Sequence, residues 1–77
     1  MILSDGKIAH SYIVQDMYLE EDIERRLEML GMTTGVMLTI LNKKRCGAII
    51  LKVRGTRFAL GRQIAAGIEI GEINNEK

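Results

Sequence analysis

The residues that could carry out chemistry are few and stand far apart in the sequence. His10 is the only histidine and Cys46 is the only cysteine, so together they cannot complete a tetrahedral zinc site. A general base or nucleophile needs a partner side chain next to it, and the sequence suggests none for His10, which we expect within a strand. Cys46 is expected in a loop, as an incidental thiol. We therefore expect no catalytic residue, no metal site, no cofactor and no enzyme activity.

Other motifs that would indicate chemistry are explained by structure or are absent. Five carboxylates close together in the first half of the chain fit the solvated side of an amphipathic helix better than a cation site. They are Glu20, Glu21, Asp22, Glu24 and Glu28. The sequence contains neither the glycine-lysine loop nor the glycine-rich fingerprint that holds nucleotide phosphates. The common nucleotide-binding loops are therefore excluded.

The net charge of +1 conceals an uneven distribution of charged residues. Residues 1–28 hold seven acids and three bases, whereas residues 29–68 hold no acid at all. The bases of this middle segment are Lys43, Lys44, Arg45, Lys52, Arg54, Arg57 and Arg62. Clustered cations of this kind can bind an acidic partner, although a solvated surface is the simpler interpretation. We take these seven residues as the candidate partner-binding surface.

The first part of the chain predicts one strand and one helix. Residues 7–16 are mixed apolar and β-prone, which favours a strand. In residues 19–30, apolar side chains recur at helical spacing, with acids at the start and Arg25 and Arg26 further along. The order predicts ion pairs from Glu21 to Arg25 and from Asp22 to Arg26. Gly31 is expected to end the helix in a left-handed conformation.

After Gly31 the apolar period changes to two, which predicts strands over residues 36–41 and 49–54. A polar loop over 43–47 joins them. A single helical turn is expected over 61–67, followed by a last strand that begins at Ile68 and extends to Ile70 or Ile73.

One hairpin is predicted with its register. Gly55 and Thr56 separate two β-prone runs, and glycine in the first position of a two-residue turn favours type II′. The predicted register pairs Arg54 with Arg57 on the outer face, beside Lys52. The inner face carries four apolar side chains, namely Leu51, Val53, Phe58 and Leu60.

These elements predict a mainly β fold with one helix, a small antiparallel β-barrel of about five strands. Residues 1–73 are expected to form one domain, and residues 74–77 a polar tail. Three apolar residues fall on strand faces opposite the core and are a possible apolar interface for weak homo-oligomers: Met37, Leu41 and Ile50. No apolar run reaches the length of a membrane span, and no secretory signal is evident. Together with the single cysteine, this favours the cytoplasm.

Two segments resemble one protein family. The run from Arg26 to Gly35, RLEMLGMTTG, and the run from Val53 to Leu60, VRGTRFAL, are similar to paired motifs of the FeoA family. The resemblance implies an SH3-like barrel that serves as a cytoplasmic accessory of ferrous-iron transport. Its implied partner is a FeoB-type transporter, contacted at the cytosolic G-protein region. Contact with the membrane surface would then arise through the transporter.

The alternative function is a small nucleic-acid-binding barrel or another SH3-like interaction module. The basic segment would suit phosphates. Against nucleic acid stands the scarcity of aromatic residues, because base stacking requires exposed rings. The sequence holds only Tyr12, Tyr18 and Phe58.

Overall fold

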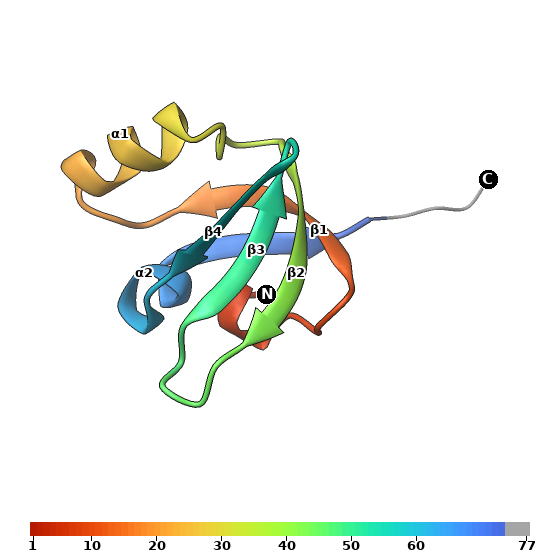
Figure 1. The fold of residues 1–77 in the computed structure, drawn as a ribbon. Coiled ribbons are helices and arrows are strands. Elements are labelled where there is room, and N and C mark those ends of the chain that lie inside the picture. The colour runs from red at the N-terminus through yellow and green to blue at the C-terminus, as the bar shows by residue number, and fades with distance from the viewer. Residues whose placement is uncertain (74–77) are drawn as a thin grey trace.

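The computed structural model describes residues 1–73, and within them five strands form one antiparallel sheet (Figure 1). In chain order the elements are η1 (Leu3–Asp5), β1 (Ser11–Met17), α1 (Glu21–Met29), β2 (Met37–Lys43), β3 (Ile49–Val53), β4 (Thr56–Leu60), α2 (Arg62–Ala66) and β5 (Ile68–Glu72). The strand order is β4-β3-β2-β1-β5. The predicted fold class, mainly β with one main helix, is confirmed.

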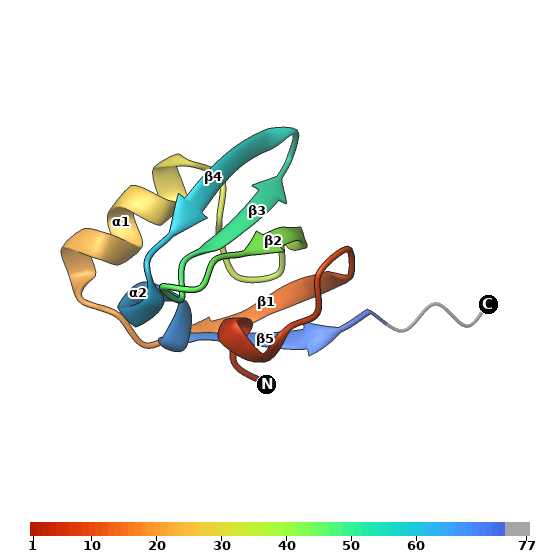
Figure 2. The same cartoon turned by 60° about the horizontal axis from the view of Figure 1, so that its bottom comes forward.

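The sheet folds over itself, so that β2, β3 and β4 lie above β1 and β5 (Figure 2). Its register shifts at Gln15 in β1 and at Leu41 in β2. Such bulges increase the local twist and allow a strand to bend. The inward side chains of both layers are buried, together with side chains from η1, the helices and the segment after α1. The buried side chains are Leu3, Tyr12, Val14, Leu27, Met32, Leu38, Ile40, Ile49, Leu51, Val53, Leu60, Ala65, Ile68 and Ile70.

Helix α1 begins two residues later and ends one residue earlier than predicted, and Gly31 stops it in a left-handed conformation as expected. Gly31 has a φ of 94° and donates its amide hydrogen to the carbonyl of Glu28, while Met32 donates to the carbonyl of Leu27. These two bonds define a Schellman motif. Leu27 and Met32 are both buried, as the apolar contact of that motif requires. Of the two predicted ion pairs, the structure contains Arg25 with Glu21 at 3.5 Å.

Replacing Gly31 by alanine should destabilise the domain by about 1–2 kcal/mol, because a left-handed conformation costs an L-residue that much. An alanine Cβ would come no closer than 3.5 Å to its nearest neighbour, the Arg54 side chain. Backbone strain is therefore the cause, and Gly31→Asn should recover part of the loss. Urea unfolding of the three proteins measures the difference. Equal stability of wild type and Gly31→Ala would contradict the motif.

The predicted register of the β3–β4 hairpin is wrong. Val53 pairs with Thr56 and Leu51 with Phe58, so the turn residues are Arg54 and Gly55. Both have positive φ, 54° and 84°, which is type I′ rather than type II′. Compared with the predicted register, the partner of each β3 residue is shifted by two positions along β4. Side chains alternate between the two faces with a period of two, so a shift of two positions leaves every side chain on its predicted face. The prediction therefore assigned the correct faces with the wrong partners.

Three of the four predicted inward side chains in this hairpin are buried. They are Leu51, Val53 and Leu60, whereas Phe58 is half-buried and packs against the edge of the core. Phe58 lies on the outermost strand, where no neighbouring strand covers its other side. Its partial exposure follows from this position.

The segment before β1 is more structured than predicted. Residues 7–10 form a loop rather than the start of a strand, with Ala9 at a φ of 72°. The loop is held by Ala9 donating to the carbonyl of Ile40 and by Ile40 donating to the carbonyl of His10. Upstream of it, Leu3 is fully buried. The amino-terminal segment is thus part of the core.

The end of the chain largely follows the prediction. The expected helical turn is α2, and β5 ends at Glu72, so Ile73 lies beyond it. The predicted polar tail, residues 74–77, lies outside the described residues.

Candidate interaction surface

Metal-ligating side chains are not grouped within residues 1–73. No three histidine, cysteine or acidic groups lie in a position to hold a metal ion. His10 is exposed, in the loop before β1 rather than on a strand, with its Nδ1 3.1 Å from the carbonyl oxygen of Ile8. Cys46 is also exposed, in the β2–β3 loop.

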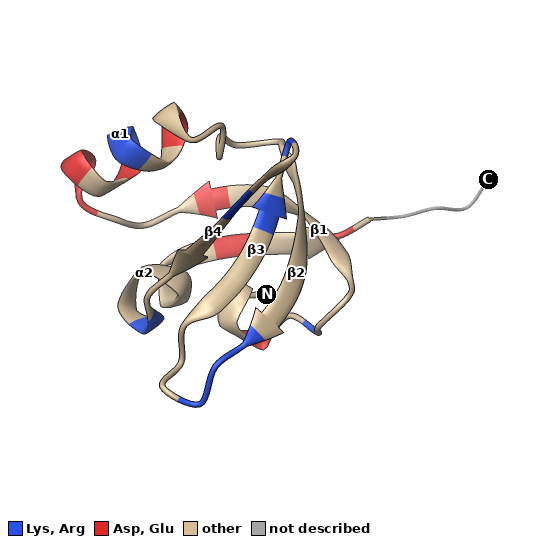
Figure 3. Cartoon of the chain, in the orientation of Figure 1, with Lys and Arg blue, Asp and Glu red and all other residues tan. Residues whose placement is uncertain are grey.

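The basic residues of the middle segment fall into two groups at opposite ends of the domain (Figure 3). Lys52, Arg54 and Arg57 lie at the β3–β4 turn, and we call them the hairpin cluster. The other four, Lys43, Lys44, Arg45 and Arg62, lie at the β2–β3 loop and at the start of α2, and we call them the loop cluster. The sequence analysis had taken all seven bases together as one candidate surface. The fold separates the two clusters because β3 runs between them.

The hairpin cluster is built by the β3–β4 register. Lys52 and Arg57 are direct cross-strand partners on the outer face, where the prediction had paired Arg54 with Arg57. All three side chains of the cluster are exposed. Like charges placed directly opposite each other oppose strand pairing, and a left-handed arginine adds backbone strain. Both features lower the stability of the hairpin, and uncharged residues at these positions would stabilise it more.

The loop cluster is more involved in holding the fold. The Lys43 ammonium donates a hydrogen bond of 3.0 Å to the carbonyl oxygen of Gly6. The aliphatic part of Arg62 lies so close to Gly47 that a Cβ added there would stand 2.8 Å from it. Gly47 has a φ of 100°, so glycine suits both the backbone and the space. These contacts account for two of its four cations.

Most of the acidic residues lie away from both clusters, in and just before α1, at the end of β1 and in β5 (Figure 3). The exception is Asp5 in η1, which precedes Gly6, the residue whose carbonyl oxygen accepts the hydrogen bond from Lys43. Among the described residues the ion pairs are those of Arg25 with Glu21 and of the Met1 ammonium with Glu69. Neither pair involves any of the seven bases.

The three predicted interface residues do not form one patch. Met37 is 54% exposed at the start of β2, whereas Leu41 and Ile50 are half-buried near its other end. Thr39 and Lys52 pair with each other on the same face between them. The sequence analysis missed Met29, which is 83% exposed at the end of α1. Self-association through Met37, Leu41 and Ile50 remains a prediction.

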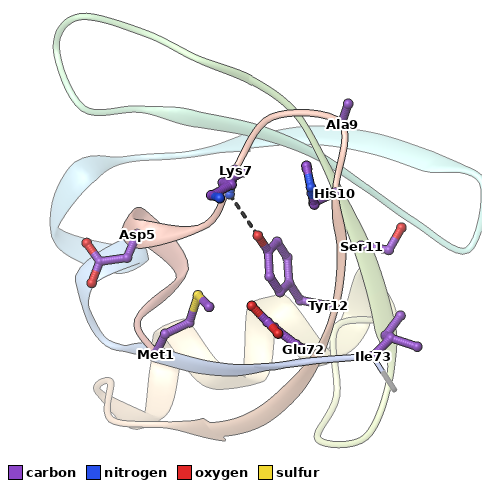
Figure 4. Close-up of a pocket in the computed structure, with 9 residues that line it drawn as sticks. All are labelled: Met1, Asp5, Lys7, Ala9, His10, Ser11, Tyr12, Glu72 and Ile73. Carbon is purple, nitrogen blue, oxygen red and sulfur yellow. Dashed lines mark hydrogen bonds between the residues drawn. The ribbon is translucent and has the colours of Figure 1, made fainter. Parts of the chain in front are cut away.

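A cavity of about 430 Å³ lies between the amino-terminal segment and the ends of β1 and β5 (Figure 4). Its lining consists of Met1, Asp5, Lys7, Ala9, His10, Ser11, Tyr12, Glu72 and Ile73. The Tyr12 hydroxyl accepts a 2.9 Å hydrogen bond from the backbone amide of Lys7. The lining mixes acids and bases, so its charge selects no single class of ligand. Sequence reasoning missed this cavity because it depends on the loop over residues 7–10.

The Asp16 carboxylate raises the pKa of the Tyr18 phenol by charge repulsion and by accepting its hydrogen bond at 3.3 Å. Tyr18 is also the one aromatic residue of the described chain that is mostly exposed, at 70%.

The described residues contain no helix long and apolar enough to cross a membrane. The strand order, the bent sheet and the helix inserted between β1 and β2 define a small SH3-like barrel domain, as the resemblance implied. A family model described as the FeoA domain matches residues 1–71. The chain therefore belongs to the FeoA family, which is associated with ferrous-iron uptake.

Solved structures support the same assignment. The solution structure of the FeoA protein from Chlorobium tepidum has a TM-score of 0.90 and 27% identity, over 100% of this chain and 74% of that one. The crystal structure of an iron uptake regulatory protein, FeoA, has a TM-score of 0.85 and 26% identity, over 95% and 97%. The repressor ScaR with bound Zn²⁺ shares the fold at a TM-score of 0.83 and 24% identity, and the match covers 95% of this chain but only 37% of that one. None of the curated proteins compared with the sequence matches it.

Proposed function

We propose that this protein is a cytosolic accessory protein of ferrous-iron uptake that binds the G-protein region of a FeoB-type transporter. It acts by binding and catalyses no reaction of its own. Any contact with the membrane surface arises through the transporter. Membership of the FeoA family supports the link to iron uptake, and the hairpin cluster supports binding of an acidic partner.

The observation that carries this proposal is the arrangement of Lys52, Arg54 and Arg57. Lys52 and Arg57 face each other across two strands, and Arg54 occupies a left-handed turn position. Neither choice favours the hairpin, and no described residue forms an ion pair with these cations. Residues that oppose stability often serve binding. Arginine adds a planar donor group that can hold a carboxylate with two hydrogen bonds.

The test is the double variant Arg54→Glu with Arg57→Glu, titrated by calorimetry against the isolated G-protein region of a FeoB-type transporter. We expect affinity to fall about tenfold or more, since two attractive charges become repulsive. Exposed charges are screened beyond about 8 Å at physiological salt, so wild-type binding should weaken as salt rises. The fold should remain, because glutamate and arginine carry similar strain at position 54.

The matched control is Lys44→Glu with Arg45→Glu, which makes the same charge change in the loop cluster. Retained binding by this control assigns the effect to the hairpin cluster and not to net charge. Equal affinity of wild type and Arg54→Glu/Arg57→Glu would reject the proposed surface. Single-stranded RNA is titrated in parallel, and tight binding of RNA without binding of the G-protein region would favour the nucleic-acid alternative.

A further inference from the structure

The two outer strands of the sheet differ in how their free edges are used. At β5, the amino-terminal segment adds to the edge, because Ile2 pairs with Glu69 and Ile70 donates a 2.6 Å hydrogen bond to the carbonyl of Met1. At β4, the described structure contains no such addition, and β3 is its only strand neighbour. The outer edge of β4 is therefore open to pairing.

The backbone groups at this edge follow from the register. Val53 and Thr56 close a two-residue turn, so they form a hydrogen-bonded pair, and such pairs alternate along antiparallel strands. Thr56, Phe58 and Leu60 consequently direct their backbone groups at β3. Arg57 and Ala59 direct their amide hydrogens and carbonyl oxygens outward.

No described residue supplies a hydrogen-bond partner for those outward backbone groups of Arg57 and Ala59. Buried backbone groups are nearly always paired, so these groups face solvent. Both side chains are exposed as well. The edge thus presents two donors and two acceptors spaced as an added strand requires.

The side chains on β4 describe the strand that would fit. Arg57 lies on the outer face next to Lys52, so a residue paired with Arg57 would extend this row of cations. An acidic residue is the most favourable at the position paired with Arg57, since opposite charges stabilise cross-strand pairs. Phe58 points inward but is half-buried. An apolar residue beside Phe58 would cover its exposed part.

We propose that the outer edge of β4 receives an extended acidic segment of a partner protein as an added strand. In this segment an acid pairs beside Arg57 and an apolar residue lies beside Phe58, so acidic and apolar residues alternate. The inference rests on the proposed function, for which it specifies the mode of binding. A second copy of this chain is a poor occupant, because two edges would bring their arginines and lysines together.

The test variant is Ala59→Pro. Proline is tolerated on an edge strand where its missing amide hydrogen would face solvent, so the fold should remain. The added strand would lose one hydrogen bond and meet the proline ring, and we expect its affinity to fall about tenfold. The matched control is Ala59→Thr, which keeps the amide and adds a β-prone side chain. It should bind as the wild type does.

Two titrants are used with each protein. One is a synthetic peptide in which glutamate alternates with valine, with a lysine-for-glutamate version as control. The other is the G-protein region of a FeoB-type transporter. Amide hydrogen exchange, followed residue by residue, provides a second measurement on the unaltered protein. The amides of Arg57 and Ala59 should exchange quickly in the free protein and slowly in the complex.

Slowed exchange at Arg57 and Ala59 with the glutamate peptide, together with weaker binding by Ala59→Pro, supports the edge site. Should Ala59→Pro fail to fold, the exchange measurement decides alone. Unslowed exchange with both titrants overturns the edge site. Equal slowing by the lysine peptide also overturns the proposal, because the edge would then show no preference for an acidic segment. Slowed exchange in concentrated protein alone overturns it too, because a second copy of the chain would then occupy the edge.

The outcomes separate this inference from the proposed function. If the G-protein region binds and the charge reversal at Arg54 and Arg57 abolishes binding, but neither titrant slows exchange on β4, the transporter proposal stands and the edge site fails. If the glutamate peptide slows exchange and the G-protein region does not bind at all, the edge site stands and the transporter proposal fails.

Discussion

Replacing Leu3 by alanine is expected to destabilise the domain by about 2–5 kcal/mol, the usual cost of truncating a fully buried leucine. Leu3 has no exposed surface although it stands near the start of the chain. A domain of this size has a total stability of about 4–12 kcal/mol. Chemical unfolding followed by circular dichroism should therefore show Leu3→Ala largely unfolded or with a strongly lowered midpoint.

Ile2 provides the matched control, because it is adjacent, apolar and 37% exposed. Ile2→Ala should cost about 1 kcal/mol or less, since only part of its side chain leaves an apolar environment. Similar midpoints for the two variants would mean that the amino-terminal segment does not pack as described.

The second large effect is expected at Gly6, where alanine should cost about 1–3 kcal/mol through overpacking. A Cβ at this position would collide with Cδ1 of Ile40 and stand 3.1 Å from the Tyr12 ring. Both neighbours are buried, so neither can move aside freely. The free energy of unfolding of Gly6→Ala, from urea titration, gives the cost.

A double-mutant cycle identifies the cause of this loss. Ile40→Val removes the colliding methyl group and alone should cost about 0.5–1.5 kcal/mol. In the Ile40→Val protein, Gly6→Ala should be tolerated better, so the double variant should be more stable than the sum of the single losses predicts. Strict additivity would assign the cost of Gly6→Ala to something other than Ile40.

The sequence was sufficient for elements whose determinants are local. The apolar stripe and acidic start of α1 predicted the helix, and Gly31 predicted its end. The period of two predicted β2 and β3 and placed Leu51 and Val53 inside.

Other features depend on contacts that no local pattern encodes. The turn at Arg54 and Gly55 was missed because arginine is unusual in a left-handed position. The apolar pattern could not correct the error, because both registers place the same side chains on the inner face. The burial of Leu3 and the close packing of Gly6 depend on Ile40 and on β5, which lie far along the chain. The separation of the basic residues into two clusters follows from the path of β3, which runs between them, and the sequence pattern does not give this path.

The left-handed Arg54 bears on how this domain would respond to laboratory evolution. Asparagine followed by glycine is the preferred pair in a type I′ turn, so selection for heat resistance alone should favour exchanging Arg54 for asparagine. That exchange would also remove a cation from the hairpin cluster. Variants chosen for heat resistance should then bind an acidic partner less well, and variants chosen for binding should keep the arginine. The turn is a position at which the two selections diverge.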